Sequence, residues 1–270
     1  MTDARADLAT VYLVLPAYNE QASLPALLER AKSALGSRRD LEYRVVVVND
    51  GSTDRTLEVA QSHAGRMPLT IVDHGRNRGL GEAIKSGLAK AVELARPGDV
   101  IVTMDADNTH PPDLIPPMMR KIRDGYDLVV ASRYVDGAEQ VGLRPHRKVL
   151  SRGAGLLMKT LFPIPGVRDY SCGFRAYSAA ILSRAVAAYG NAFVEEQGFS
   201  CFVDILLKLR RLNVRACEVP LVLRYDFKEG ASKMRIGRTI RRYIRLMAKN
   251  LVAPGTRPFR RFDPTASVNG

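Results

Sequence analysis

The sequence lacks any long apolar run. No stretch approaches the roughly 18 consecutive apolar residues that a membrane-spanning helix requires. Residues 1–10 contain two aspartates and no apolar segment, so we do not expect a secretory signal peptide. Cysteine is scarce: Cys172, Cys201 and Cys217 lie far apart and form no Cys-x-x-Cys pair, which predicts reduced packing residues of a cytosolic protein. The few histidines are scattered and do not predict a zinc site.

Positive charge is concentrated near the carboxyl terminus. The chain of 270 residues has a formal net charge of +13, and Lys228–Phe262 contains eleven lysines and arginines against one acid, Glu229. Such an excess predicts an anionic partner: nucleic acid, a membrane surface or a phosphorylated substrate. Aromatic residues make up only 7% of the chain and no stacking motif accompanies the arginines, so we expect no nucleic-acid binding and keep it as a distant alternative.

Strands and helices alternate in the first half of the sequence. Helical spacing is found at Leu24–Ala34, Gly81–Leu94 and Asp113–Asp124, and Thr53 or Asp54 can cap a further helix that runs to about Ala64. Short apolar runs between them predict strands at Val11–Leu15, Tyr43–Val48, Leu69–Val72, Val100–Met104 and Leu128–Ala131. This order predicts the α/β class with a mostly parallel, doubly wound (Rossmann-like) sheet flanked by helices.

The second half of the sequence does not continue this regular alternation of strands and helices. We expect a loop without regular structure at Val135–Arg144 and a strand at Val214–Leu223. Helices are predicted at Ser151–Phe162, Leu182–Ala188, Phe202–Leu212 and Met234–Leu251. The last helix is amphipathic and basic, with one apolar stripe formed by Ile236, Ile240, Tyr243, Ile244, Met247 and Leu251. It predicts binding to the surface of an anionic bilayer, and the alternative is that the stripe packs on the protein core.

Two carboxylates follow the strand at Val100–Met104. Alternation along an extended chain would send Asp105 and Asp107 to the same side, at the carboxyl end of a parallel strand. Paired carboxylates there suit Mg²⁺ or Mn²⁺, which complete their coordination with substrate phosphates. Taken alone, an Asp-x-Asp pair more often caps the strand end and the next helix, with no metal involved.

Polar residues also follow the first two strands. The first strand ends in Pro16-Ala17-Tyr18-Asn19-Glu20, where a dinucleotide-binding protein would have Gly-x-Gly-x-x-Gly. Tyr18 can stack on a base, and the carboxylates of Glu20 and Asp50 can accept hydrogen bonds from a base or a ribose. Each of these segments, taken alone, could equally be a strand-end turn.

Five motifs in a fixed order decide between simple turns or caps and a nucleotide and metal site. They are Pro16-Ala17-Tyr18-Asn19-Glu20, Asn49-Asp50-Gly51-Ser52-Thr53-Asp54, Asp105-Ala106-Asp107 with His110-Pro111-Pro112, Ser132-Arg133-Tyr134 and Ala231-Ser232-Lys233. With them the chain resembles the family 2 inverting glycosyltransferases of GT-A fold, and among these the dolichyl-phosphate mannose synthase-like group, over roughly Val11–Leu251.

The resemblance implies roles for the matching residues. A metal ion would be held by Asp105, Asp107 and Thr109, the last at a position where relatives often have Gln or Ser. The phosphate of the acceptor would be bound by Arg133, Arg147 and Ser151, and the catalytic set would be Asp107, Arg133 and Lys233. Nucleotide-sugar binding would involve Pro16, Tyr18, Glu20, Val48, Asp50, Asp105, Ala106, Asp107, Arg133, Lys228 and Lys233. Lys228 is included because Phe227 stands where an arginine is expected, six residues before Lys233.

The resemblance also implies the reaction. It is the metal-dependent transfer of a hexose from a nucleoside diphosphate sugar, GDP-mannose before UDP-glucose, to a polyprenyl phosphate with inversion. A lipid phosphate is already anionic and needs no general base, whereas a hydroxyl acceptor needs one. For that alternative the candidate bases are Asp169, Glu195, Glu196 and Asp204.

The expected organisation is a catalytic domain followed by a basic tail. Residues 1–230 would form the GT-A domain, with a nucleotide-sugar half at about 10–133 and an acceptor half at about 134–230. Residues 231–270 would form a mobile loop, the amphipathic helix and a tail. We expect a short form without transmembrane helices at the cytoplasmic face of the membrane, bound peripherally, with a separate membrane subunit as a further candidate partner.

Overall fold

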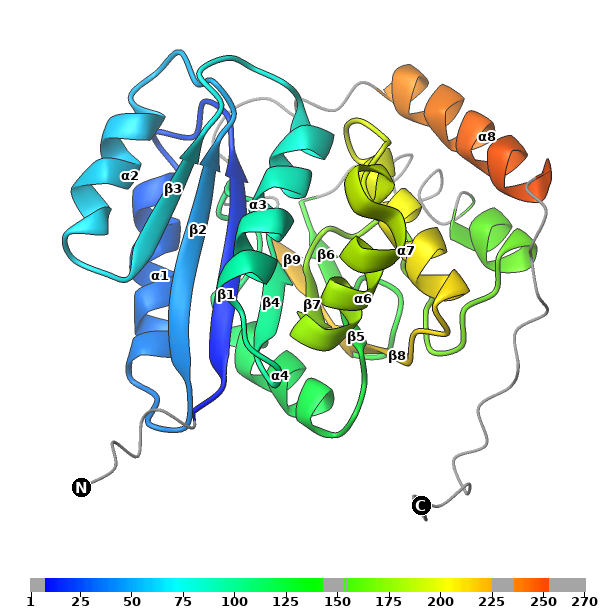
Figure 1. The fold of residues 1–270 in the computed structure, drawn as a ribbon, viewed down its shortest axis with the longest axis horizontal. Helices are drawn as coiled ribbons and strands as arrows, with labels where there is room; N and C mark the ends of the chain where they lie inside the picture. Colours follow the sequence, from blue (N-terminus) through cyan, green and yellow to red (C-terminus); the bar gives the residue numbers. More distant parts are fainter. Residues whose placement is uncertain (1–7, 143–152, 154, 225–235, 253–270) are drawn as a thin grey trace.

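A twisted sheet forms the centre of the protein (Figure 1). The computed structural model describes residues 8–142, 153, 155–224 and 236–252. The sheet has the strand order β3-β2-β1-β4-β7-β5-β8. Its strands are β1 (Thr10–Ala17), β2 (Glu42–Asn49), β3 (Leu69–Asp73), β4 (Val100–Thr103), β5 (Leu128–Ser132), β7 (Arg175–Ser178) and β8 (Ala216–Pro220). Figure 1 shows α3 in front of the sheet and α1 behind it, which confirms the predicted α/β class.

The helices match the expected positions closely. They are α1 (Leu24–Gly36), α2 (Thr56–Ala64), α3 (Leu80–Leu94), α4 (Ile115–Arg123), α6 (Ala179–Tyr189), α7 (Ser200–Arg211) and α8 (Ile236–Val252), with 3₁₀ turns η1 (Pro112–Leu114) and η2 (Gly190–Ala192). Residues 155–161 are also helical. Within the described ranges, every helix is too short or too polar to cross a bilayer.

The sheet is mostly parallel, with one exception that the sequence did not reveal. β1 pairs in parallel with β2 and β4, and β5 pairs in parallel with β8. β7 lies antiparallel between β4 and β5. This strand has only four residues and contains Arg175, which is fully buried and donates hydrogen bonds to the carbonyls of Phe202 and Tyr170 at 2.6 and 2.8 Å. A buried arginine interrupts the apolar pattern by which the other strands were recognised.

Two expectations for the second half were wrong. The predicted loop contains β6 (Glu139–Val141), which pairs in parallel with β9 (Val222–Arg224) in a small second sheet. The predicted strand Val214–Leu223 is divided into β8 and β9 at Leu221, whose N–H donates to the carbonyl of Ser132. The chain therefore leaves the main sheet at this point and joins the second sheet through β9.

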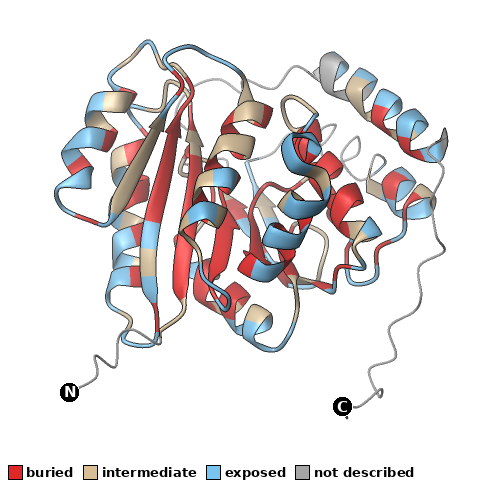
Figure 2. Ribbon diagram, viewed as in Figure 1, coloured by how far each residue is buried: buried red, intermediate tan, exposed pale blue. Residues whose placement is uncertain are grey.

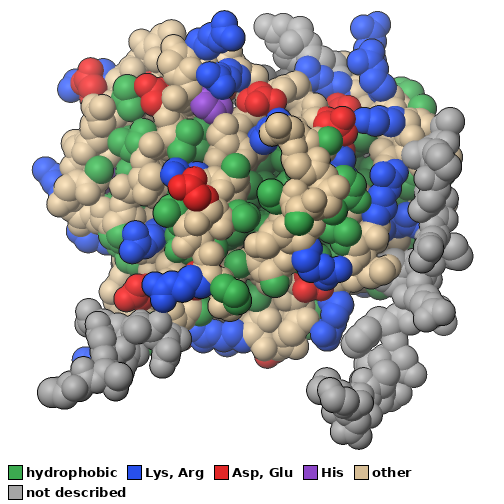
Figure 3. All heavy atoms as spheres, viewed as in Figure 1, with side chains coloured by type: hydrophobic (Ala, Val, Ile, Leu, Met, Phe, Trp, Pro, Cys, Tyr) green, Lys and Arg blue, Asp and Glu red, His purple; other side chains and the backbone are tan. Residues whose placement is uncertain are grey.

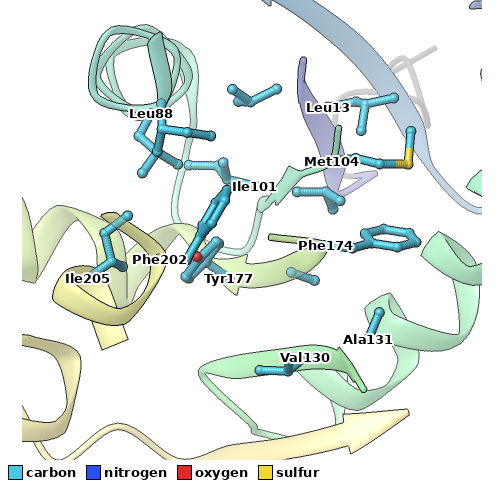
Figure 4. Close-up of a cluster of buried hydrophobic side chains, with 14 of the residues drawn as sticks. Leu13, Leu88, Ile101, Met104, Val130, Ala131, Phe174, Tyr177, Phe202 and Ile205 are labelled. Atoms are coloured by element: carbon cyan, nitrogen blue, oxygen red, sulfur yellow. The ribbon is translucent and has the colours of Figure 1, made fainter. Parts of the chain in front are cut away.

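Buried side chains on both faces of the sheet hold the strands rigid. All four residues of β4 are buried, as expected for a strand that is covered on two sides. Figure 4 shows Ile101, Phe202 and Tyr177 grouped on one side of this core, and Figure 2 shows the buried residues following the central strands. This packing fixes the strand ends, from which the polar loops project.

The apolar stripe predicted for α8 is divided between two sides of the helix. Tyr243 and Met247 of the stripe pack against the buried core on the side of Leu246, which is 1% exposed, and Asn250 accepts a hydrogen bond from Arg211 of α7 at 3.0 Å. Ile244 and Leu251 are 59% and 56% exposed on the other side. Figure 3 shows Lys and Arg side chains along the upper right of the molecule, where α8 lies in Figure 1.

Close packing of α3 on the sheet depends on Gly87. A Cβ atom there would lie 2.4 Å from Cγ1 of Val14 and 3.0 Å from Cγ2 of Val48, and both valines are fully buried. We expect Gly87→Ala to lower the free energy of unfolding by about 1–3 kcal/mol, because neither strand can move away. Urea denaturation measures this change. The control is Gly65→Ala, because nothing lies within 4 Å and φ is −80°, so it should be neutral or slightly stabilising. Equal midpoints for the two variants would contradict the packing argument.

Candidate active site

The candidate site lies at the carboxyl ends of the parallel strands. β1, β2 and β3 run in the same direction, and their arrowheads meet at the top of Figure 1. The last residue of β1, Ala17, is paired with Asn49, the last residue of β2. Open α/β sheets bind their ligands at this edge. The loops that follow β1, β2, β4 and β5 are therefore the parts that can meet a substrate.

The loops after β1 and β2 are linked by hydrogen bonds. Asn19, at φ 52°, donates its N–H to Ser52 Oγ at 3.1 Å and accepts the N–H of Thr53 at 2.8 Å. The N–H of Glu20 donates to Thr56 Oγ1 at 2.8 Å. The two motifs that the sequence assigned to one nucleotide site thus form one surface. Of the predicted residues, Val48 is fully buried, whereas Pro16, Tyr18 and Glu20 are half-buried.

Asp50 holds the loop that leads into α3. Its carboxylate accepts the N–H groups of Arg78 and Gly79 at 2.9 and 2.8 Å, and it lies 2.8 Å from Nδ1 of His74. Nε2 of His74 lies 2.9 Å from Oγ of Ser86. Asp50 is only 3% exposed. It therefore shapes the loop beside the expected nucleotide position, a role that the sequence did not reveal.

The Asp-x-Asp segment lies in a bend and not in an extended strand. β4 ends at Thr103 and residues 106–108 form a bend, so Asp105 and Asp107 follow the strand as expected but do not continue it. Oδ1 of Asp107 accepts the hydroxyl and the N–H of Thr109 at 2.6 and 3.2 Å. The residue between them, Asn108, has a φ of 60°.

Two side chains outside this bend hold it in place. Arg30 of α1 donates to Oδ1 and the carbonyl of Asn108 at 2.6 and 3.3 Å. The N–H of Asp105 donates to Nδ1 of His110 at 3.3 Å, and the His110 ring packs against Phe174 with centroids 5.2 Å apart. Ala106 is buried at 2% exposure. Arg30 was not among the predicted site residues, because a helix-face arginine has no motif to distinguish it.

The residues of this bend fit a hard divalent cation. The predicted ligands Asp105, Asp107 and Thr109 lie within five residues and supply only carboxylate and hydroxyl oxygens. Among the residues that the structure describes, no group of three or more His, Cys, Asp or Glu side chains could form an all-protein metal cage. Two carboxylates with substrate phosphates are the arrangement that Mg²⁺ and Mn²⁺ use in such sites.

Arg133, at the end of β5, is held by a buried carboxylate. Its Nε and Nη2 atoms donate to the two oxygens of Asp169, both at 2.7 Å, and Nη2 also donates to Ser171 Oγ at 2.7 Å. The guanidinium lies 5.3 Å from the centre of the Tyr134 ring. Asp169 is fully buried, and burial alone would raise its pKa, but the charge and hydrogen bonds of Arg133 hold this pKa below its ordinary value.

The other carboxylates that were candidate bases are engaged as well. Asp204 is 3% exposed, accepts the N–H of Glu195 at 2.9 Å and pairs with Lys208 at 2.9 Å. Glu195 contacts Lys208 and Lys249 at 2.9 and 3.1 Å. The hydrogen bond from Lys208 lowers the pKa of Glu195 against the opposing effect of burial. Glu196 lies 3.4 Å from the hydroxyl of Ser200.

Four predicted site residues cannot be placed in this arrangement. Arg147, Ser151, Lys228 and Lys233 lie outside the described residues, so their roles stay predictions.

The fold and these loops define an α/β protein with its ligand site at the carboxyl ends of parallel strands. A family model for Glycosyl transferase family 2 matches residues 12–188, and the chain belongs to this family. The predicted enzyme class, a glycosyltransferase, is thereby confirmed.

Several known proteins are similar to this chain. A dolichol-phosphate mannosyltransferase from Pyrococcus furiosus is 33% identical over 236 residues, which cover 87% of this chain and 62% of that protein. An undecaprenyl-phosphate mannosyltransferase from Micrococcus luteus is 34% identical over 225 residues, 83% of this chain and 87% of that protein. The chain thus spans less than two thirds of the length of the Pyrococcus protein.

The fold is shared with a solved enzyme. The crystal structure of glucosyl-3-phosphoglycerate synthase from Mycobacterium tuberculosis in complex with Mn²⁺ and UDP-glucose superimposes with a TM-score of 0.63 at 20% identity. The match covers 93% of this chain and 82% of that chain. This similarity confirms the expected GT-A architecture.

The contacts of Asp50 predict how its loop responds to substitution. In Asp50→Asn one acceptor oxygen becomes an amide that opposes a backbone N–H of Arg78 or Gly79, so we expect a loss of about 1–3 kcal/mol in stability. Hydrogen–deuterium exchange at these two amides should become faster. The control Ser86→Ala removes only the partner of His74 Nε2 and should leave both amides protected. Unchanged exchange in Asp50→Asn would show that the loop does not depend on this carboxylate.

Proposed function

We propose that this protein transfers a hexose from a nucleoside diphosphate sugar to a polyprenyl phosphate, with inversion at the anomeric carbon. One observation carries the proposal: relatives named for dolichol-phosphate and undecaprenyl-phosphate transfer share about a third of their residues with this chain over 83–87% of its length. GDP-mannose is the first candidate donor. UDP-glucose is the second, because a dolichyl-phosphate β-glucosyltransferase from Trichomonas vaginalis is also 31% identical.

The donor would bind across the loops after β1, β2 and β4. Tyr18 and Glu20 are half-buried on the surface that the first two loops form, where a base and a ribose can be recognised. Asp105 and Asp107, with Thr109 bonded to Asp107, would hold Mg²⁺ or Mn²⁺. Such an ion supplies positive charge that stabilises a diphosphate leaving group.

The contacts of two of the candidate bases, Asp169 and Glu195, favour a phosphate acceptor over a hydroxyl acceptor. A hydroxyl requires a general base with a pKa near the working pH. Asp169 is bonded to Arg133 and Glu195 to Lys208, and the pKa of each carboxyl is held below its ordinary value. A polyprenyl phosphate is already anionic, so it needs a cation to position it and no base. Arg133, with Arg147 and Ser151, would supply that contact.

The release of nucleotide by purified protein tests this function. We expect release from GDP-mannose or UDP-glucose that requires Mn²⁺ or Mg²⁺ and a short polyprenyl phosphate, and a loss of at least about 100-fold in Asp107→Ala. The matched control is Asp113→Ala, an exposed residue that follows the same bend. Release that needs the metal but ignores the lipid phosphate would overturn the proposed acceptor. No release with any donor would overturn the proposed reaction.

We further propose that α8 brings the enzyme to the cytoplasmic face of an anionic bilayer. Its outer side combines exposed Ile244 and Leu251 with the exposed cations Arg241, Arg245 and Lys249. Leu156 and Leu157 in helical residues 155–161 are 68% and 47% exposed, and Figure 1 draws this segment at the same end of the molecule. Apolar side chains beside cations are the composition of helices that lie in a membrane interface.

Flotation with liposomes tests the role of α8. Each cation near an anionic surface contributes about 1 kcal/mol, so Arg241→Glu combined with Arg245→Glu should weaken binding to phosphatidylglycerol vesicles at least about 30-fold. The control pair Arg39→Glu and Arg66→Glu reverses two exposed arginines on the opposite half of the chain and should bind like the wild type. Equal flotation of both pairs would contradict the assignment to α8.

A further inference from the structure

The hydrogen bonds of Arg133 leave one of its nitrogens for a ligand. An arginine has five N–H donors in a rigid plane. Nε donates to Asp169, and the two hydrogens of Nη2 are used by Asp169 and Ser171. Across the described part of the chain, no hydrogen bond is made by Nη1. The direction in which Nη1 points is therefore set by Asp169 and Ser171, since they fix the plane of the guanidinium.

The turn that carries Asp169 is itself held by a second carboxylate. Oε1 of Glu218 accepts the N–H groups of Arg168 and Asp169 at 2.7 and 2.6 Å. Glu218 lies in β8 and is paired with Val130 of β5, the strand that ends next to Arg133. Two strands of the sheet therefore position the ion pair of Arg133 and Asp169. β5 ends directly before Arg133, and β8 carries Glu218, which holds the turn that contains Asp169.

Asp169 is fixed through its side chain as well as its backbone. Its Oδ1 accepts the N–H groups of Ser171 and Cys172 at 3.2 and 3.0 Å, in addition to Nη2 of Arg133. Its Oδ2 accepts both Nε and the backbone N–H of Arg133. The carboxylate is therefore saturated by groups that hold it still, and it can orient the arginine without a direct contact to substrate.

Glu218 can perform its role without a negative charge. Burial raises the pKa of Glu218, and the nearby charge of Asp169 acts in the same direction. The two hydrogen bonds that its Oε1 accepts come from backbone N–H groups, and a neutral carbonyl oxygen accepts such bonds as well. A glutamine at this position would keep the acceptor, whereas an alanine would leave two N–H groups without their partner.

We propose that Glu218 is a positioning residue, which acts through Asp169 and Ser171 to direct Nη1 of Arg133 toward a substrate phosphate. This inference rests on the proposed function only for the nature of that phosphate. The diphosphate of the donor and the phosphate of the lipid acceptor share the required chemistry, and separate binding measurements distinguish them.

The decisive experiment compares Glu218→Ala and Glu218→Gln with and without Arg133→Lys, which keeps the charge but removes the planar fork. We expect Glu218→Ala to lower kcat/KM at least about tenfold, because small displacements of a substrate-binding group are costly, and Glu218→Gln to restore most of the activity. In the Arg133→Lys background, Glu218→Ala should have no further effect. A loss of the same factor in both backgrounds, or equal damage by Ala and Gln, would overturn the proposal.

Measurements of ligand binding test the positioning role of Glu218 without requiring turnover. Titration with GDP and with farnesyl phosphate should show one dissociation constant raised about tenfold in Glu218→Ala, which identifies the phosphate that Arg133 contacts. If neither constant changes, the positioning role is wrong even where the transfer reaction is confirmed. A wild type that binds these ligands without transfer would contradict the proposed function and leave this binding test valid.

Two further variants separate positioning from stability. Ser171→Ala removes a single contact of Nη2 and should reproduce a smaller loss of about threefold in the same dissociation constant, even if Glu218→Ala does not fold. Glu42→Ala, at an exposed strand residue, is the control and should change neither constant. Wild-type binding by Ser171→Ala would overturn the inference that these contacts orient Arg133.

Discussion

The antiparallel strand β7 is the constraint on which the candidate site depends. It separates β4 from β5, so the Asp-x-Asp bend and Arg133 follow strands that are two positions apart, roughly 10 Å. Hydrogen bonds hold both neighbours to the start of β7: the hydroxyl of Thr103 donates to the carbonyl of Gly173 at 2.7 Å, and the N–H of Ala131 to the carbonyl of Phe174 at 3.0 Å. The spacing between the carboxylates of one loop and the cation of the other is thus fixed by backbone geometry.

The charges of the loops after β4 and β5 then determine which ligand can bind between them. The β4 side supplies carboxylates and the β5 side a guanidinium, an arrangement that suits a metal ion on one side of a phosphate group and an arginine on the other. Arg133 remains oriented because separating it from Asp169 would leave a buried charge unpaired, at a cost of about 3–5 kcal/mol. Since the pKa of Asp169 is lower in the folded chain, this pair stabilises the fold at neutral pH, and its contribution is lost as the pH falls through that lowered pKa.

The sequence predicted those strands whose residue pattern directly reflects their burial in the fold. Val45–Val48 is a continuous run of valines because this part of β2 is covered on both faces, and the strand predicted at Tyr43–Val48 matches β2 to within one residue at each end. β7 was missed because Arg175 is charged yet fully buried, with its hydrogen bonds supplied by distant carbonyls. The Arg133–Asp169 pair joins residues 36 apart, and nothing local signals it. Motif order assigned Arg133 to phosphate binding, but only three-dimensional contacts reveal which of its nitrogens are already used.

The donor loops and α8 are joined by one continuous series of contacts. Gly81, in the first turn of α3, has no space for a Cβ, which would lie 2.2 Å from the carbonyl of Glu196. The next residue, Gln197, accepts a hydrogen bond from Arg242 of α8 at 2.6 Å through its carbonyl. The start of α3 is also where Asp50 anchors the preceding loop. A rigid displacement of α8 would therefore strain Glu196 and Gln197, which pack against the first turn of α3. While these contacts persist, α8 and the nucleotide-sugar half of the protein cannot move independently.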